Sequence, residues 1–198
     1  MSKCPDVPNP CPPSRPQLLM ETTDTIFKYP SGVLGVTDKL PDSAQLFQQT
    51  LKSKGLDARV VVLPQSTRTA KEAAAAIGCQ VEQIAKSLVF QRTDTNQPVL
   101  VIASGSNRVD EQLVSSYLKA SIVKADADFV RSSTGYAIGG IPPLGHRIPI
   151  QTLIDQDLLR LDPVWAAAGT PHAVFSVSPH ELVAITDGNV IAVSGSTP

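Results

Sequence analysis

The sequence lacks the features that mark several large classes of protein. None of its apolar runs reaches the length of a membrane span, and only 18% of its 198 residues are charged. The N-terminus lacks the basic-then-apolar order of a secretory signal, so we expect a cytoplasmic protein with no membrane association. The 17 Lys and Arg residues form no cluster. This argues against an extended phosphate-binding surface, although recognition of a short nucleic-acid end needs only a few contacts.

Cysteine and histidine are also scarce. Three cysteines, at positions 4, 11 and 79, cannot form a disulfide framework, and the three histidines are not in metal-ligand spacing with them. The sequence contains no G-x-S-x-G elbow, Walker loop, dinucleotide fingerprint or zinc deaminase signature. The sequence therefore predicts no metal and no cofactor, and it disfavours chemistry by a protein nucleophile.

Proline is concentrated at the N-terminus, where it makes up six of the first sixteen residues. Such a segment is expected to be disordered or polyproline-like. Met20 is a plausible alternative start. We therefore predict a tail and lead-in over residues 1–41, partly disordered, and one domain over residues 42–198.

Helix signals are clear from Asp42 onward. Asp42 or Ser43 is expected to cap a helix that places Leu46, Phe47 and Leu51 on one face and ends at Gly55. A capping box over residues 69–72 opens an alanine-rich helix that Gly78 ends. Further helices are expected at 107–119 or 110–119, 126–132 and 179–185.

Strands alternate with these helices. They are expected at 59–63, 87–91, 99–103, 147–154, 164–167, 173–177 and 190–193. The second and third form a hairpin around residues 96–98, which requires antiparallel pairing. The predicted fold class is α/β (α+β), a single compact domain with a mixed, mostly antiparallel sheet flanked by helices.

The most informative segment is the glycine- and proline-rich run over residues 135–145, Gly-Tyr-Ala-Ile-Gly-Gly-Ile-Pro-Pro-Leu-Gly. Pro142 and Pro143 lack an N–H, so the donors of its central part are the amides of Gly139, Gly140 and Ile141. Such a loop suits the presentation of backbone amides to a carbonyl or an anion. The alternative is a tight connection between two strands.

Two further residues are candidates for chemistry. Lys86 stands at the mouth of an apolar strand, where it could bind a phosphate or a carboxylate, or simply extend to solvent. His172 follows Gly169, Thr170 and Pro171 in a turn, where it could carry a proton or have no role. We expect His146 to lie at a loop edge and His180 to be solvated at a helix start.

Four segments recur together in one known family. They are Thr67–Gly78, Gln83–Phe90, Gly135–Gly145 and Ser178–Thr186, in this order. The arrangement resembles the YbaK / prolyl-tRNA synthetase editing-domain family, whose free-standing members are aminoacyl-tRNA deacylases. The resemblance covers roughly residues 43–194, nearly all of the chain that we expect to be ordered.

The resemblance implies a hydrolase that removes a wrongly attached amino acid from the 3′ acceptor end of a tRNA, without a cofactor. Lys86 would contact the terminal adenosine region, and Gly139 and Gly140 would direct amides at the aminoacyl carbonyl. A small amino acid and a prolyl-tRNA-editing type of activity are expected, with an aminoacyl-tRNA synthetase as a further partner. The residues implied in substrate binding are Ile141, Pro142, Pro143, Gly169, Thr170 and His172.

Two alternatives remain open at this point. The same pocket could serve a non-catalytic module that binds an aminoacyl or nucleotide ligand, because no general base is evident. It could also hydrolyse small amino-acid esters, for which tRNA is irrelevant. Neither the amino acid, the tRNA nor the oligomeric state follows from the sequence.

Overall fold

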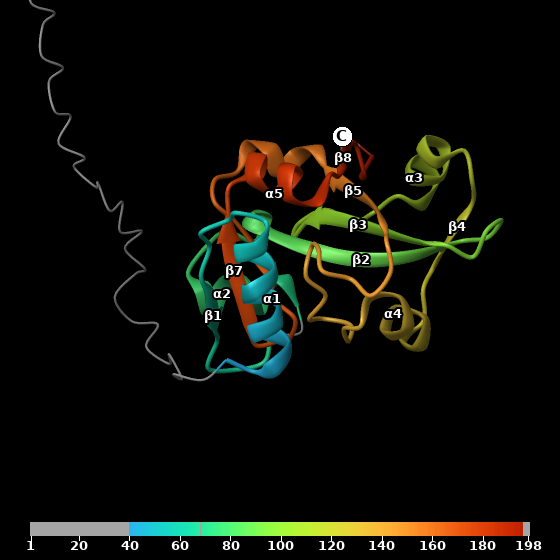
Figure 1. Ribbon diagram of the computed structural model, residues 1–198. Coiled ribbons are helices and arrows are strands. Elements are labelled where there is room, and N and C mark those ends of the chain that lie inside the picture. Colours follow the sequence, from blue (N-terminus) through green and yellow to red (C-terminus); the bar gives the residue numbers. More distant parts are fainter. Residues whose placement is uncertain (1–39, 68, 196–198) are drawn as a thin grey trace, which may run out of the picture.

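The structure is a computed structural model that describes residues 40–67 and 69–195 (Figure 1). Of the predicted tail and lead-in, residues 1–39 with Met20 lie outside the described residues. The alternation of strands and helices begins at Asp42, the residue at which the sequence patterns become regular.

The described residues contain five α-helices and two short 3₁₀ helices, most of which end or begin at the expected signals. Thr69 and Glu72 form the predicted capping box of the second helix, and Gly78 ends it with a φ of 80°. Asp110 caps the third helix through the amides of Gln112 and Leu113. The helices are α1 (Asp42–Ser53), α2 (Ala70–Ile77), η1 (Val81–Gln83), α3 (Glu111–Leu118), α4 (Ala127–Thr134), η2 (Gln156–Arg160) and α5 (Pro179–Thr186).

Within the described residues, eight strands form one mixed sheet in the order β1-β7-β6-β2-β3-β5-β8, with β4 paired to β2. Four pairings are antiparallel, including the predicted hairpin, and three are parallel. The predicted fold class is therefore confirmed. The strands are β1 (Val60–Val62), β2 (Ile84–Arg92), β3 (Pro98–Ser104), β4 (Ile122–Lys124), β5 (Gln151–Asp155), β6 (Val164–Ala167), β7 (Ala173–Val177) and β8 (Asn189–Ile191).

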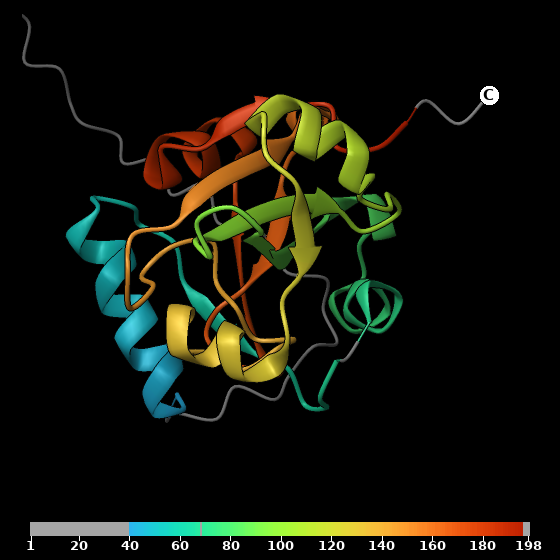
Figure 2. The same cartoon turned by 90° about the vertical axis from the view of Figure 1, so that its right-hand side faces the viewer.

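Helices surround the strands on several sides. In the view of Figure 2, α3 and α5 lie above the strands, α4 below them, and α1 and α2 on opposite sides. The largest buried cluster joins α1, α5 and the 135–145 segment to the centre of the sheet. Smaller clusters lie under α3 and under α2. Burial of these apolar faces is the main stabilising contribution to the fold.

Some local predictions were wrong. Residues 147–150 are not part of β5, and β4 was not predicted. Helix α1 starts at Asp42 with Pro41 at its N-cap, so neither Asp42 nor Ser43 caps it. Leu46 is 58% exposed, while Ala44, Phe47 and Leu51 are buried. The buried stripe of α1 thus passes through Ala44, because positions three and four residues apart share a helix face.

Candidate functional site

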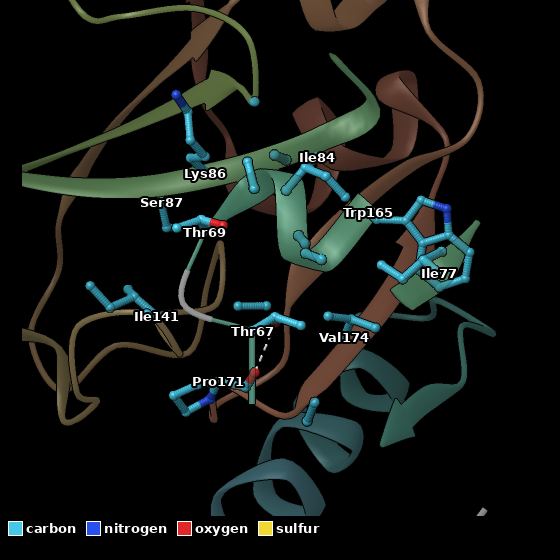
Figure 3. A pocket seen from close by; sticks show the side chains of 18 of the residues that line it. Thr67, Thr69, Ile77, Ile84, Lys86, Ser87, Ile141, Trp165, Pro171 and Val174 are labelled. Atoms are coloured by element: carbon cyan, nitrogen blue, oxygen red, sulfur yellow. Dashed lines mark hydrogen bonds between the residues drawn. The ribbon is translucent and has the colours of Figure 1, made fainter. Parts of the chain in front are cut away.

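A cavity of about 480 Å³ lies between β2, α2, the 135–145 segment and the turn that joins β6 to β7 (Figure 3). Much of its lining is apolar. Figure 3 shows Ile77, Trp165 and Val174 on one side and Ile141 on the other. The volume falls within the range of small-molecule sites, in which apolar walls surround a few polar groups.

Two of the three central amides of the 135–145 loop lack an acceptor. The N–H of Gly140 donates to the carbonyl of Ala137 at 3.0 Å, so the expected set of three available donors is reduced to Gly139 and Ile141. Neither of these two amides has a hydrogen-bond acceptor within the described part of the chain, and both residues line the cavity. Gly139 has a φ of 90°, a conformation that favours glycine.

Gly140 has a steric role. A Cβ atom at this position would lie 2.7 Å from the Cα of Thr170. The backbones of the loop and of the turn over residues 169–172 therefore pack directly against each other, and only glycine permits this approach. The contact joins two segments that are 30 residues apart in the sequence.

His146 supports the loop from behind. Its Nε2 donates to the carbonyl of Pro142 at 2.9 Å. Burial lowers the pKa of His146, and the hydrogen bond to Pro142 opposes this shift. The neutral ring is therefore favoured, with the proton on Nε2. The prediction of a loop-edge residue did not include this contact, because Pro142 is four residues away and its carbonyl must first be turned toward the ring.

The turn over residues 169–172 is fixed by its neighbours. Gly169 has a φ of 95°, and a Cβ there would lie 2.8 Å from the carbonyl oxygen of Ser43. The carbonyl of Pro171 accepts from the N–H of Thr67 at 3.1 Å and from its Oγ1 at 3.0 Å. Thr170 lines the cavity, whereas the exposed side chain of His172 does not.

Lys86 lies on β2 beside the cavity, but its ammonium group turns away from Ile141 and Pro171 (Figure 3). Its Nζ donates to the backbone carbonyl of Asn107 at 2.6 Å. Burial lowers the pKa of Lys86, and the negative charge of Asp155 opposes this shift. The cation is thus held at the edge of the cavity by a defined partner.

Asp155 organises the surroundings of Lys86. This carboxylate is fully buried at the end of β5. Its Oδ2 accepts from the N–H of Ser104 at 3.1 Å and from Nδ2 of Asn107 at 2.8 Å. The same Nδ2 also donates to Asp157 at 2.8 Å. Asp155 thus fixes Asn107 through a hydrogen bond and places negative charge near Lys86.

Of the nine residues predicted for the site, four line the cavity: Lys86, Gly139, Ile141 and Thr170. Gly140, Pro142, Pro143, Gly169 and His172 are outside the lining, although contacts of Gly140, Pro142 and Gly169 shape the segments that form it. His180 is exposed, as expected.

Sequence reasoning missed Ser87 and Asp155, and it gave Asn107 only as a possible helix start. Ser87 lines the cavity, and Asn107 and Asp155 hold Lys86. One signal was available for Asp155: it ends the apolar run Leu153–Ile154 and is followed by Gln156 and Asp157. An acid at the end of a buried strand is unusual, because aspartate is rarely fully buried without partners.

The described residues contain neither a cluster suited to a metal ion nor a membrane-spanning helix. No group of three or more His, Cys, Asp or Glu side chains among them could hold a metal ion. In the same residues no helix is long and apolar enough to span a membrane. Gly139 and Ile141, whose amides have no acceptor among the described residues, line the cavity together with Lys86, and the apolar part of the lining leaves room for a small group.

Comparison with known proteins gives a consistent result. The profile of the family described as "Aminoacyl-tRNA editing domain" matches residues 64–185. Uncharacterized protein YwhH of Bacillus subtilis (strain 168) is 30% identical over 117 residues, which cover 59% of this chain and 74% of that protein. Proline--tRNA ligase of Limosilactobacillus fermentum is 32% identical over 94 residues, 46% of this chain but only 16% of that enzyme.

Solved structures agree with these relatives. A crystal structure presented as a proposed trans-editing enzyme for prolyl tRNA synthetase has 43% sequence identity and a TM-score of 0.76, and it covers 80% of this chain and 100% of its own. The crystal structure of hypothetical protein APE2540 has 29% identity and a TM-score of 0.71, with 76% and 99% covered. Residues 64–185, which match the family, contain the lining of the cavity and both glycine-containing segments.

Proposed function

The chain belongs to the aminoacyl-tRNA editing domain family, and we propose that it hydrolyses the ester between a wrongly attached amino acid and the 3′ end of a tRNA. The observation that supports this most directly is the pair of amides at Gly139 and Ile141, which lack an acceptor and line the same cavity as Lys86. Backbone donors of this kind stabilise the negative charge that develops on a carbonyl oxygen during acyl transfer.

The reaction needs no protein nucleophile. A water molecule, or water oriented by a hydroxyl of the tRNA end, attacks the carbonyl carbon, and the bond to the ribose oxygen breaks. One proton of the water ends on that ribose oxygen and the other is released to solvent, so the amino acid leaves as its carboxylate. Gly139 and Ile141 hold the carbonyl oxygen, and Lys86 binds the terminal adenosine region. The site further lowers the reaction barrier by holding the reactants in position.

Thr170 and the residues of its turn form the second wall of the proposed substrate site. In this assignment Gly140, Pro142 and Pro143 keep the two donors in place, Gly169 shapes the turn, and His172 stands at its outer edge. Alanine at positions 166 and 167, both in the cavity lining, suggests a small amino acid. Hydrophobic pockets separate substrates that differ by one methylene by only about 1–3 kcal/mol, which is one reason for a separate editing step.

The relatives point to tRNA for proline as the tRNA that carries the wrong amino acid. One similar structure is presented as a trans-editing enzyme for prolyl tRNA synthetase, and a second relative is a proline--tRNA ligase. We therefore expect tRNA for proline as the substrate, a prolyl-tRNA synthetase as the enzyme whose errors are corrected, and the cytoplasm as the place of action.

A panel of alanyl, cysteinyl, seryl, threonyl and prolyl tRNAs tests the proposal. We expect the protein to release one or a few of these amino acids, and Lys86→Ala to lower the rate at least a hundredfold while the protein remains folded. Lys124→Ala is the matched control, because Lys124 is an exposed strand lysine outside the cavity lining. Full activity of Lys86→Ala on every good substrate would contradict the site.

The same panel separates the two alternatives. Binding of aminoacyl-tRNA without turnover would show a binding module. Equal turnover of an aminoacyl-tRNA and its aminoacyl-adenosine fragment would show an ester hydrolase for which the tRNA is irrelevant.

A further inference from the structure

Ser87 carries a polar atom that the fold leaves without a partner. Its Oγ is buried and makes no hydrogen bond, and it is the one such side-chain atom in residues 40–67 and 69–195. Ser87 also lines the cavity. Buried polar side chains in folded proteins almost always have a hydrogen-bond partner, so an exception in a cavity indicates that a ligand supplies it.

The backbone of Ser87 lies at a gap in the sheet. On the edge of β2 that faces away from β3, β6 pairs with residues 84–85 and β4 pairs with residues 90–92. Between these pairings the edge has no partner strand. Val89 accepts from the N–H of Ala125 at 3.2 Å on the β4 side. Because alternate residues of a strand direct their backbone groups to the same edge, the N–H and C=O of Ser87 point into this gap.

The position of Ser87 in the cavity can be compared with the three groups on the α-carbon of an aminoacyl ester. The α-carbon of such an ester carries a carbonyl, a side chain and an amino group. In the proposed site Gly139 and Ile141 hold the carbonyl, and the apolar wall with Ile77, Trp165 and Val174 receives the side chain. In Figure 3 Ser87 lies on the same side of the cavity as Ile141, opposite that apolar wall.

The charged residues of the lining determine how an amino group could be bound in the cavity. Among the described residues that line the cavity there are two lysines, Lys71 and Lys86, and no aspartate or glutamate. An amino group must therefore be bound by neutral acceptors, and the backbone carbonyl and Oγ of Ser87 are two such acceptors on one residue. A hydroxyl can also donate to the unprotonated amine.

We propose that the Ser87 edge of β2 binds the α-amino group of the aminoacyl ester. This rests on the proposed deacylase function and adds a third point of attachment to it. Three attachments fix the α-carbon in space, so the amino group sets the angle at which the carbonyl faces the loop amides.

The test compares two esters that differ only in this group. Alanyl-tRNA carries the amino group, and propionyl-tRNA has a hydrogen in its place. The kcat/KM of the wild-type protein and of Ser87→Ala is measured on both, by single turnover at high enzyme concentration where the reaction is slow. If another amino acid is removed faster, its ester and the matching deaminated ester are used.

We expect Ser87→Ala to lower kcat/KM about five- to tenfold on alanyl-tRNA, the effect of about one hydrogen bond, and less than about twofold on propionyl-tRNA. The thermal unfolding midpoint should not fall, because the hydroxyl has no partner to lose. Ser176→Ala is the matched control, since Ser176 is a half-buried strand serine outside the cavity lining, and it should change neither rate.

Two results would overturn the assignment: an equal loss on both esters, or no loss on either. A wild-type protein that hydrolyses no ester of the panel would instead overturn the proposed function itself. The two failures are therefore distinguishable.

Discussion

The cavity has two walls that are built in different ways. The strand wall consists of residues 84–88 of β2, with Asn107 and Asp155 behind them. The loop wall consists of residues 135–145 and the turn over residues 169–172. Ladder hydrogen bonds to β3 fix the strand wall, whereas the loop wall has no ladder and depends on a few close contacts. The difference indicates that single substitutions should disturb the loop wall more than the strand wall.

Gly140→Ala should have the largest effect on activity, because it adds a methyl group at the closest contact of the loop wall. The added Cβ would lie 2.7 Å from Cα and 2.8 Å from the carbonyl carbon of Thr170, both backbone atoms that cannot rotate away. A displacement of the neighbouring donors by about 1 Å should lower kcat/KM about a hundredfold. The free energy of unfolding should fall by about 1–3 kcal/mol, as for other overpacked sites.

Gly195→Ala is the matched control for this variant. A Cβ at Gly195 meets nothing within 4 Å. Both variants are compared by deacylation kinetics and urea unfolding. Unchanged kinetics in Gly140→Ala would mean that the close contact with the turn does not position the donors.

Asp155→Asn in the strand wall should have a smaller effect and lower kcat/KM about tenfold. The substitution removes the charge that raises the pKa of Lys86 against the effect of burial. The pKa of Lys86 should fall further, so the ammonium group should lose its proton at a lower pH. The alkaline limb of the kcat/KM profile should therefore move to lower pH. Circular dichroism and thermal unfolding verify that the variant is folded.

Asp157→Asn provides the comparison for Asp155. Asp157 accepts from the same Nδ2 of Asn107 at the same 2.8 Å, but it is less buried and does not contribute to the pKa shift of Lys86. The alkaline limb of the kcat/KM profile of Asp157→Asn should stay close to that of the wild-type protein. Equal shifts in both variants would show that Asn107, rather than the charge of Asp155, controls Lys86.

The smallest expected effect is on the pH dependence of stability, and it comes from His146, behind the loop wall. Its pKa in the folded protein is lowered by burial, so the unfolded chain binds more protons below about pH 6.5. The stability should therefore decrease as the pH falls through this value. His146→Gln can still donate to Pro142 but does not titrate, so its unfolding midpoint should depend less on pH between 7 and 5.

His146→Ala completes this comparison. It removes the hydrogen bond to Pro142 and should lower the free energy of unfolding by about 1 kcal/mol at neutral pH. Thermal unfolding across this pH range measures both variants. The same pH dependence in His146→Gln and the wild-type protein would assign the effect to another group.

Local signals predicted most of the elements. The capping box of Thr69 and Glu72 and the hairpin of β2 and β3 formed as expected, and of the two expected starts of α3 Asp110 is its cap. Each depends on contacts within a few residues or on the alternation of side chains. Leu46 was wrongly expected to be buried. Either Leu46 or Ala44 could lie beside Phe47 on the buried face of α1, and only packing against the sheet shows that Ala44 does.

The candidate site was predicted in part. Lys86, Gly139, Ile141 and Thr170 line one cavity, although they come from three segments far apart in the chain. Ser87 was missed because a serine in a strand has no local signature. Asp155 was missed although it ends an apolar run, because the run does not show which donors surround the carboxylate. Their significance depends on which neighbours the sheet brings to them: none for the Oγ of Ser87, and three donors for Asp155.

By itself, the sequence determined the order of most elements, the mixed sheet, the resemblance to the editing-domain family and the glycines and prolines that concentrate donors in one loop. Only the tertiary structure decided which of these donors remain available. Gly140 uses its amide within the loop, and its lack of a side chain lets the loop approach Thr170. The physical reason is that composition sets how many amides a segment carries, whereas the path of the folded loop, which packs against Thr170, sets which of them meet an acceptor.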